Sequence, residues 1–247
     1  MALLVDIEKH LGDFCLEAKL EVGNEVLGLV GNSGCGKRLA LRCIAGIEKP
    51  DRGRIVLDGV TLFDSEKQIN LTPQKRHTGL MFQNYALFPN MTVRQNIRAG
   101  TLRDRQTEEE RDRKVNDIMD SFGLSALAQH YPRQLSGGQQ QRTALARILV
   151  SEPWILMLDE PFSALDSELK FRMEREVREV IDRFGKTTLL VSHDRGEAFR
   201  LSDRIAMMHD GRVNHILSKE EWLLESNSVI ISTDSIPQNV ILVPMES

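Results

Sequence analysis

Apolar residues along this chain form two kinds of pattern, short continuous runs and stripes at helical spacing. The runs lie at Val26–Val30, Thr78–Phe82, Trp154–Glu160 and residues 187–194. Each is short and nearly all apolar until its last residues, which is typical of a strand buried on both faces of a parallel sheet. We therefore expect these four segments to form the central strands of a sheet.

Alternating and helical patterns surround these runs. Before residue 21, apolar and polar residues alternate in two successive segments, which predicts an antiparallel pair of strands. Apolar residues on one face predict helices at Leu39–Ala45 and Ser167–Phe184. Asp58-Gly59 and Asp210-Gly211 each stand between apolar segments, where an Asp-Gly pair predicts a β-hairpin. Together the patterns predict an α/β fold.

The same patterns predict how the chain is divided. We expect one domain over residues 1–225, with an α-helical subdomain at about residues 84–134, and a tail of uncertain structure at residues 226–247. Within the subdomain, charges of both signs alternate from Arg103 to Lys114, which is typical of the solvated face of a helix. A helical lining is expected to continue from Ile118 to Leu127.

Composition narrows the range of functions. With 41% hydrophobic and 28% charged residues the chain can bury a large core, and its net charge of −4 does not favour a nucleic-acid partner. Acidic residues interrupt the first apolar positions too early for a signal peptide, and no apolar run approaches the roughly 18 residues of a membrane span. Cys15, Cys35 and Cys43 show no metal-ligand or disulfide spacing, which suits a reducing compartment.

A glycine-rich segment, GNSGCGK, lies between the first apolar run and the helix after it. Its glycines permit positive φ angles, so that successive N–H groups can point into one concavity at the start of the helix. Lys37 adds a mobile charge for the β and γ phosphates of a nucleotide. We interpret the segment as a P-loop rather than a plain strand-to-helix turn, with Cys35 as a small filler rather than a redox switch. The predicted nucleotide-binding residues here are Gly31, Asn32, Ser33, Gly34, Cys35, Gly36, Lys37, Arg38 and Leu39.

Arg38 departs from the P-loop pattern. The pattern has serine or threonine after the lysine, because that hydroxyl binds the Mg²⁺ between the β and γ phosphates. An arginine has no lone pair for a metal, and its charge about 4 Å from a divalent ion would be repelled by about 8 kcal/mol at an effective dielectric constant of about 20. We therefore expect Arg38 either to point away from the metal or to leave it badly held.

Polar residues follow the other three apolar runs: Gln83 after the second, Asp159 and Glu160 in the third, and His193 in the fourth. The carboxyl ends of parallel strands meet at one edge of a sheet, so these side chains are expected to join the P-loop around a nucleotide. Each also has a plainer interpretation, as a solvated strand end or a turn residue.

The segments GNSGCGK, MFQ, LSGGQQQR, ILMLDEP, SALD and VSHD together resemble the ATP-binding cassette (ABC) family of ATPases, over residues 2 to about 225. The resemblance implies a P-loop NTPase core with a mostly parallel sheet, an antiparallel β lead-in and an inserted α-helical subdomain. It implies ATP and Mg²⁺ as cofactors, and a homodimer that holds two ATP molecules between its subunits.

The resemblance also implies a role for each matching residue. Asp159 would hold Mg²⁺ through its water shell, and Gln83 would contribute to the same metal and to the attacking water. Glu160 would be the catalytic base, and His193 would contact the γ phosphate. The LSGGQ segment would clamp the ATP held by the other subunit. Nucleotide-binding residues outside the P-loop would include Ser136, Gly137, Gly138, Gln139 and Asp166.

Two of these assignments stay open at the level of the sequence. The family stacks an aromatic side chain upstream of the loop on adenine, for which Phe14 and His10 are candidates, but Phe14 is equally suited to a strand core. Ser136 is equally suited to be an ordinary helix N-cap.

Three longer segments, KHLGDFCL, LTPQKRHTGLMFQNYALFPNMTVRQNI and ARILVSEPWILMLDEPFSALD, resemble importer ATPases for molybdate, sulfate and related oxyanions. This resemblance implies membrane permease subunits as partners, docked near Tyr85 to Val93, and a cytoplasmic location on the inner face of the membrane. The plainer interpretation is that the exposed-looking aromatics Tyr85 and Phe88 belong to the subdomain core.

Three functions follow. The first is an energy-coupling ATPase of an importer, in which ATP closes the dimer and hydrolysis reopens it. The second is an ATP-binding clamp with weak or no hydrolysis, because Arg38 stands where the metal ligand belongs. The third is a non-transport cassette of translation or DNA repair. Such proteins are recognised by two fused cassettes or by a long coiled-coil insertion, and this sequence shows neither.

Overall fold

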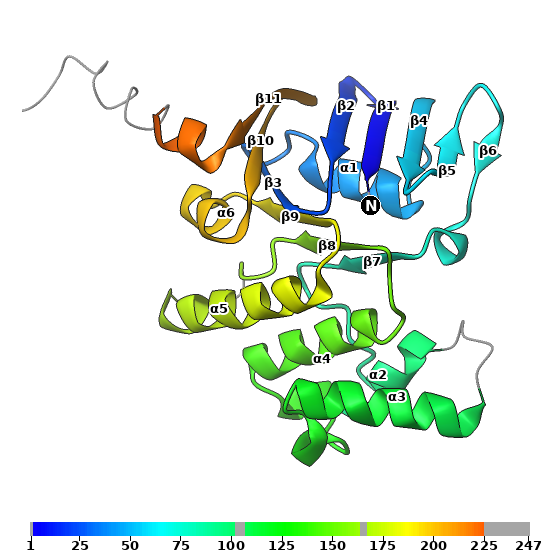
Figure 1. The fold of residues 1–247 in the computed structure, drawn as a ribbon, viewed down its shortest axis with the longest axis vertical. Helices are drawn as coiled ribbons and strands as arrows, with labels where there is room; N and C mark the ends of the chain where they lie inside the picture. The colour runs from blue at the N-terminus through cyan, green and yellow to red at the C-terminus, as the bar shows by residue number, and fades with distance from the viewer. Residues whose placement is uncertain (1, 102–106, 164–166, 225–247) are drawn as a thin grey trace, which may run out of the picture.

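The computed structural model describes residues 2–101, 107–163 and 167–224, and one mixed sheet runs through them (Figure 1). The order of strands along the sheet is β6-β5-β4-β1-β2-β11-β10-β3-β9-β8-β7. The strands are β1 (Leu3–Leu11), β2 (Phe14–Val22), β3 (Val26–Val30), β4 (Arg52–Leu57), β5 (Val60–Asp64), β6 (Ile69–Asn70), β7 (Thr78–Met81), β8 (Ile155–Asp159), β9 (Thr188–Ser192), β10 (Arg204–His209) and β11 (Arg212–Ser218).

Helices lie against both faces of the sheet (Figure 1). They are α1 (Lys37–Ala45), α2 (Val93–Arg98), α3 (Glu108–Ser121), α4 (Gly137–Leu149), α5 (Ser167–Phe184) and α6 (Arg195–Leu201). Residues 219–224 are also helical, and the predicted tail at residues 226–247 lies outside the described residues.

The four apolar runs form the parallel part of the sheet, as predicted. β3, β9, β8 and β7 are neighbours, and each pair is parallel. Along β8, Ile155 and Met157 join the core that contains α1, whereas Leu156 and Leu158 join the core that contains α4 and α5. Both faces of the strand are therefore covered, which explains why its sequence is continuously apolar.

The antiparallel part of the sheet comes from the N-terminal strands. β1 pairs with β2 and with β4, and β4 pairs with β5. The predicted hairpins at Asp58-Gly59 and Asp210-Gly211 are both confirmed. Helix α1 contacts β2 on one side and β7 and β8 on the other, so it lies between the two parts of the sheet.

The C-terminal end of α1 is held by a buried arginine. Gly46 ends the helix with a φ of 79°, and Arg76 Nη1 donates to the carbonyl oxygens of Cys43 (2.7 Å) and Ile44 (2.9 Å). These bonds satisfy carbonyl groups that have no partner within the helix. The opposite end of α1 begins directly at the glycine-rich loop.

The segment between β7 and β8 is helical, with α2, α3 and α4 below the sheet in the view of Figure 1. α3 begins after the N-cap Thr107, whose side chain accepts from the Glu110 N–H; residues 102–106 lie outside the described part. The expected helical lining up to Leu127 is wrong in one respect. α3 ends at Ser121, and Gly123, with a φ of 62°, turns the chain before Leu127.

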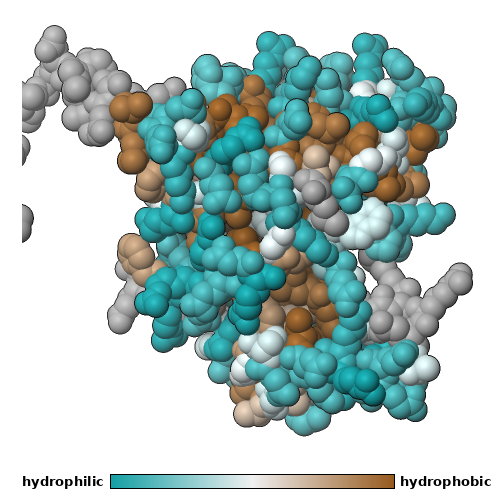
Figure 2. Space-filling model, viewed as in Figure 1, coloured by the Kyte–Doolittle hydropathy of each residue, from teal (hydrophilic) through white to brown (hydrophobic). Residues whose placement is uncertain are grey.

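The surface in the view of Figure 2 is mainly hydrophilic, with hydrophobic residues showing over the antiparallel strands and in the middle of the lower half. Leu4 of β1 and Val60 of β5 are among the exposed apolar side chains. Across the described residues, no helix has the length and apolar character needed to cross a membrane.

Candidate functional site

The glycine-rich loop joins β3 to α1 and leaves the start of that helix open. Gly36 is the N-cap of α1 with a φ of 102°, a left-handed conformation that favours glycine, and no side chain caps the first turn. The first N–H groups of α1 are therefore free of a side-chain acceptor and carry the positive end of the helix dipole. This arrangement suits a bound anion such as phosphate.

Lys37 is folded onto the loop itself. Its side chain is buried, and Nζ donates to the carbonyl oxygens of Gly31 (2.6 Å) and Asn32 (2.9 Å) and lies 3.7 Å from Cys35 Sγ. An ammonium group held only by neutral carbonyls makes weaker hydrogen bonds than one held by an anion. The lysine is thus placed to exchange these carbonyls for a phosphate.

The other loop residues divide between surface and core. Asn32, Ser33 and Gly34 are exposed, whereas Cys35 is buried in the main core and Leu39 packs against it. This burial agrees with the interpretation of Cys35 as a filler. A hollow beside the loop is lined by Gly31, Asn32, His193, Arg195, Met207 and His209, among others.

Arg38 contacts the two residues to which the family resemblance gave a role in metal binding. Its Nε donates to Asp159 Oδ2 at 2.6 Å, and its Nη2 donates to Gln83 Oε1 at 2.7 Å. Asp159 is the last residue of β8, and Gln83 lies just beyond the end of β7. Arg38 therefore does not point away from these two residues, and its guanidinium bonds the oxygens that were expected to hold the metal.

Asp159 is a buried carboxylate, with 4% of its side chain exposed. Burial raises the pKa of Asp159, and the hydrogen bond and charge of Arg38 oppose that rise. Oδ1 of Asp159 has no hydrogen-bond partner among the described residues. Because a buried carboxylate without a positive partner is costly, Arg38 stabilises the ionised form of Asp159.

Glu160 and His193 lie next to each other at the same edge. Glu160 Oε2 is 3.5 Å from His193 Nδ1, and the side chains are 19% and 61% exposed. Glu160 has a φ of 47°, and its N–H donates to the Val191 carbonyl oxygen on β9 at 2.9 Å. A non-glycine residue held at positive φ stores strain of a kind often found at functional sites. A carboxylate in this position can orient and polarise a water molecule.

The LSGGQ segment, Leu135–Gln139, begins helix α4 and satisfies its own polar groups. Ser136 Oγ accepts from the Gln139 N–H (3.3 Å), and Gln139 Oε1 accepts from the Ser136 N–H (2.8 Å). This is a capping box, so the plainer interpretation of Ser136 as an N-cap describes its present contacts. In the described part of the chain, no hydrogen bond or ion pair joins this segment to the P-loop. Asp166 lies outside the described residues.

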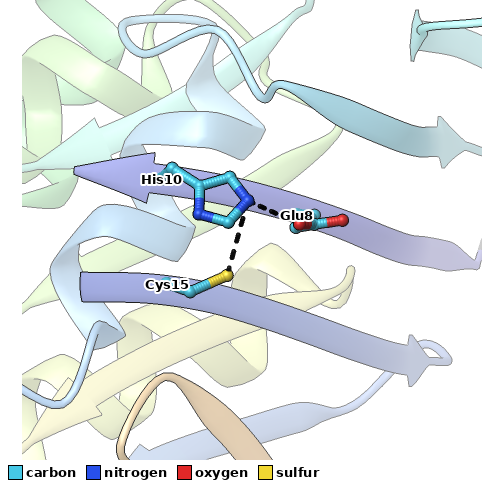
Figure 3. Close-up of side chains that lie close together, drawn as sticks. All are labelled: Glu8, His10 and Cys15. Carbon is cyan, nitrogen blue, oxygen red and sulfur yellow. Dashed lines mark hydrogen bonds and ion pairs between the residues drawn. The ribbon is translucent and has the colours of Figure 1, made fainter. Parts of the chain in front are cut away.

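Phe14 and His10, the candidates for adenine stacking, differ in their surroundings. Phe14 is half-buried and packs against the core below the loop, where a Cβ added to Gly36 would lie 3.1 Å from Phe14 Cζ. His10 Nε2 lies 2.6 Å from Glu8 Oε1 and 3.9 Å from Cys15 Sγ (Figure 3). Phe14 therefore packs in the core in this structure, and the imidazole of His10 is already bonded to Glu8.

The Glu8, His10 and Cys15 group was not visible in the sequence (Figure 3). Its ligand atoms lie within 4.8 Å of one another, although the spacing along the chain is not a metal-ligand spacing. The signal that could have revealed it is the hairpin register, because His10 stands directly opposite Cys15 on the paired strands. Desolvation and the nearby carboxylates raise the pKa of the Cys15 thiol, which keeps it protonated.

The residues present do not fit a Mg²⁺ ion as the family would hold it. Mg²⁺ is bound by oxygen ligands in a near-octahedral arrangement. Here the oxygens of Asp159 and Gln83 already accept hydrogen bonds from a guanidinium, and the hydroxyl that a P-loop places at position 38 is absent. The edge of the sheet holds a fixed positive group where the pattern calls for a metal.

A glycine-rich loop between a buried strand and an uncapped helix, with carboxylates at the end of another parallel strand of the same sheet, defines the P-loop class of α/β proteins. The family model described as ABC transporter matches residues 17–163. The chain belongs to the ABC transporter family.

Similar proteins include several import ATP-binding proteins. The spermidine/putrescine import ATP-binding protein PotA of Nitratidesulfovibrio vulgaris is 44% identical over 92% of this chain and 61% of its own length. The trehalose/maltose import ATP-binding protein MalK of Thermococcus litoralis is 41% identical over 88% of this chain and 59% of its own length. The sulfate/thiosulfate import ATP-binding protein CysA of Mesorhizobium japonicum is 40% identical over 90% of this chain and 62% of its own length. The chain thus spans about three fifths of the length of these relatives.

A solved structure shares the fold. The dimeric ATP-binding cassette MJ0796, in a post-hydrolysis state bound to ADP and phosphate, is 29% identical, with a TM-score of 0.72 over 89% of this chain and 99% of that one. The predicted α/β fold of an ABC ATPase is confirmed.

Proposed function

We propose that this chain is the ATP-binding and ATP-hydrolysing subunit of an ABC importer. The observation that carries the proposal is the meeting of the P-loop, Gln83, Asp159, Glu160 and His193 at the carboxyl ends of adjacent parallel strands. The similar proteins described above, which are import ATP-binding proteins, support it.

In this proposal the P-loop holds the triphosphate. The free N–H groups at the start of α1 and the ammonium of Lys37 bind phosphate oxygens, and Lys37 gives up its bonds to the loop carbonyls. Glu160 orients the attacking water and accepts its proton, and His193 contacts the terminal phosphate from beside Glu160. A bound Mg²⁺ ion would neutralise charge on the phosphates. The oxygens of Asp159 and Gln83 that would hold such an ion accept hydrogen bonds from Arg38 instead.

The proposed working form is a homodimer. The LSGGQ segment of each subunit would face the ATP bound by its partner, and the capping box at Ser136 would hold the start of α4 in place for that contact. The likeness to a dimeric cassette supports this arrangement. ATP binding would favour the closed dimer, and hydrolysis would release it.

The segment near Tyr85 to Val93 is the proposed docking surface for a membrane permease, which would bring the protein to the inner face of the membrane. The exposed large hydrophobic side chains there are Phe88 (46%) and Met91 (38%), whereas Tyr85 is buried with its hydroxyl 3.3 Å from the Pro161 carbonyl oxygen. Arg147 packs over the Phe88 ring and donates to the carbonyl oxygens of Tyr85 and Ala86. Phe88 and Met91 would therefore make the contact, and Tyr85 would support them from within.

The proposed solute is an oxyanion such as molybdate or sulfate. This proposal rests on the resemblance of the segments around Gln83 and Asp159 to oxyanion importers. The names of the similar proteins do not select a solute, because they include polyamine, sugar and sulfate import. The same names favour an importer over a clamp without turnover and over a translation or repair cassette.

The direct test is phosphate release from ATP by the purified chain, followed by co-purification of its permease. Turnover that depends on Glu160 supports the proposal. A chain that binds ATP without releasing phosphate would support the clamp, and a chain that binds no ATP would contradict both functions.

A further inference from the structure

Arg38 is built into the edge of the sheet as a fixed cation. It is the second residue of α1, adjacent to Lys37, and its side chain is 52% exposed. Two of its three nitrogens are used, Nε on Asp159 and Nη2 on Gln83, and Nη1 has no hydrogen-bond partner within the described ranges. The guanidinium is thus anchored on one side and has a donor left for a ligand on the other.

The anchor is a buried charge that needs this partner. Asp159 lies at the end of β8 among buried neighbours, and Lys37, the other nearby cation, donates to loop carbonyls instead. A hydrogen bond of 2.6 Å between a guanidinium and a buried carboxylate is of the strong, charge-assisted kind. Removal of Arg38 from Asp159 would leave that carboxylate uncompensated, so the pair resists displacement.

A divalent ion would have to break this pair to use the same ligands. It would need the oxygens of Asp159 and Gln83, would find no hydroxyl at position 38, and would be repelled by the guanidinium. A phosphate group meets the opposite situation. A guanidinium donates to phosphate oxygens and is never deprotonated, so Arg38, next to Lys37 in the chain, adds a second positive group that can attract the phosphate.

We infer that Arg38 takes the place of the divalent metal in nucleotide binding, so that this chain binds ATP without Mg²⁺. The inference rests on the proposed function, because it concerns the same P-loop. The guanidinium supplies the positive charge beside the terminal phosphates through Nη1, while its bonds to Asp159 and Gln83 fix its position.

The test compares ATP affinity in excess EDTA with ATP affinity in excess MgCl₂, measured by calorimetry on the purified chain. We expect the two dissociation constants to agree within about twofold. In Arg38→Ser, which restores the hydroxyl of the P-loop pattern, ATP should bind at least about tenfold more weakly in EDTA than in MgCl₂. Arg38 is half-exposed, so this variant is expected to fold, and its circular dichroism spectrum checks that it does.

Arg200→Ser is the matched control. Arg200 is also half-exposed, at 40%, and bonds through Nε (2.6 Å) to a buried carboxylate, that of Glu174, but between α5 and α6. Its removal should leave the affinity for ATP the same in EDTA and in MgCl₂. A general response of the fold to a lost arginine would appear in both variants, whereas the inferred role appears in Arg38→Ser alone.

The outcomes separate the inference from the function on which it rests. Tight binding of ATP by the natural chain in MgCl₂ and none in EDTA would overturn the inference and leave the proposed function standing. Equal metal dependence in the natural chain and in Arg38→Ser would overturn it as well, whether both proteins need the metal to bind ATP or neither does. Absence of binding in all conditions by both chains would overturn the proposed function itself.

Discussion

The N-termini of helices α1 and α4 both contain glycines and both were predicted to bind phosphate, yet they are capped differently. α1 begins at Gly36 with no side-chain cap, whereas α4 begins at Ser136 with a complete capping box. The first N–H groups of α1 have no side-chain acceptor and are available to a ligand, whereas one of those of α4 donates to the Ser136 side chain. The contrast indicates that α1 needs a ligand to satisfy its first turn and that α4 is stable without one.

The largest expected effect concerns the chemistry beside α1. Glu160→Gln should lower phosphate release by at least about 100-fold, because the amide cannot accept the proton of the attacking water. ATP affinity should be unchanged, since Glu160 orients water and does not hold the phosphates. Phosphate release and calorimetry measure the two quantities. Asp182→Asn, an exposed carboxylate paired with Arg178, is the control, and equal turnover in all three proteins would contradict the role of Glu160.

The next effect concerns the ligand of α1. Lys37→Ala should weaken ATP binding by about 30-fold, the equivalent of about 2 kcal/mol for a charge-assisted hydrogen bond. Lys186→Ala removes a lysine that likewise donates to a backbone carbonyl, that of Pro153, and should leave the affinity unchanged. If both variants bind ATP as the natural chain does, the phosphates are not held at this loop.

A smaller effect is expected at α4, on stability. Ser136→Ala removes the side-chain cap and should lower the free energy of unfolding by about 1 kcal/mol, while ATP affinity of the isolated subunit stays the same. Urea denaturation measures the change. Thr107→Ala, which breaks the capping box of α3, should cost a similar amount. A loss of ATP affinity in the isolated Ser136→Ala subunit would show that the two helix starts are not independent.

The smallest effect is a pH dependence at α6, another capped helix. Asp194 caps it and bonds Lys170 at 2.6 Å; although burial opposes them, these bonds lower the pKa of Asp194 from 3.8 to about 2. Because the pKa is lower in the folded state, the stabilisation is present above pH 3.8 and is lost as the pH falls towards 2. Solvent screens this partly exposed pair, so the loss should stay below about 1 kcal/mol.

The measurement is the urea midpoint of unfolding as a function of pH, in the natural chain and in Lys170→Met. The variant should show a smaller loss of stability between pH 3.8 and about 2, because Lys170 is a main cause of the lowered pKa. Parallel curves for the two proteins would mean that the Lys170–Asp194 bond does not contribute.

Much of the sheet could be predicted from the sequence because each of these strands and turns has a recognisable pattern within a few residues. Four apolar runs gave β3, β7, β8 and β9, and two Asp-Gly pairs gave the hairpins. The end of α3 was harder, since Leu124 and Leu127 are apolar and still pack against the core after Gly123 has ended the helix. An apolar stripe reports burial, and it does not report where a helix stops.

The contacts of the candidate site were predictable only in part. The P-loop pattern marked Arg38 as unusual, but which acceptors it reaches depends on the order of β3, β9, β8 and β7 in the sheet. Likewise Tyr85 is buried in a core built from several segments, and its hydroxyl reaches the carbonyl of Pro161, a partner far along the chain. Side-chain pairs between distant segments carry no local signal.

The most direct test of the account is a crystal structure of the chain with a non-hydrolysable ATP analogue, grown in EDTA. The account predicts a triphosphate over residues Gly34–Lys37, with Lys37 Nζ moved from the Gly31 carbonyl to a phosphate oxygen and Arg38 still bonded to Asp159. A loop without nucleotide, or an analogue bound elsewhere on the molecule, would contradict it.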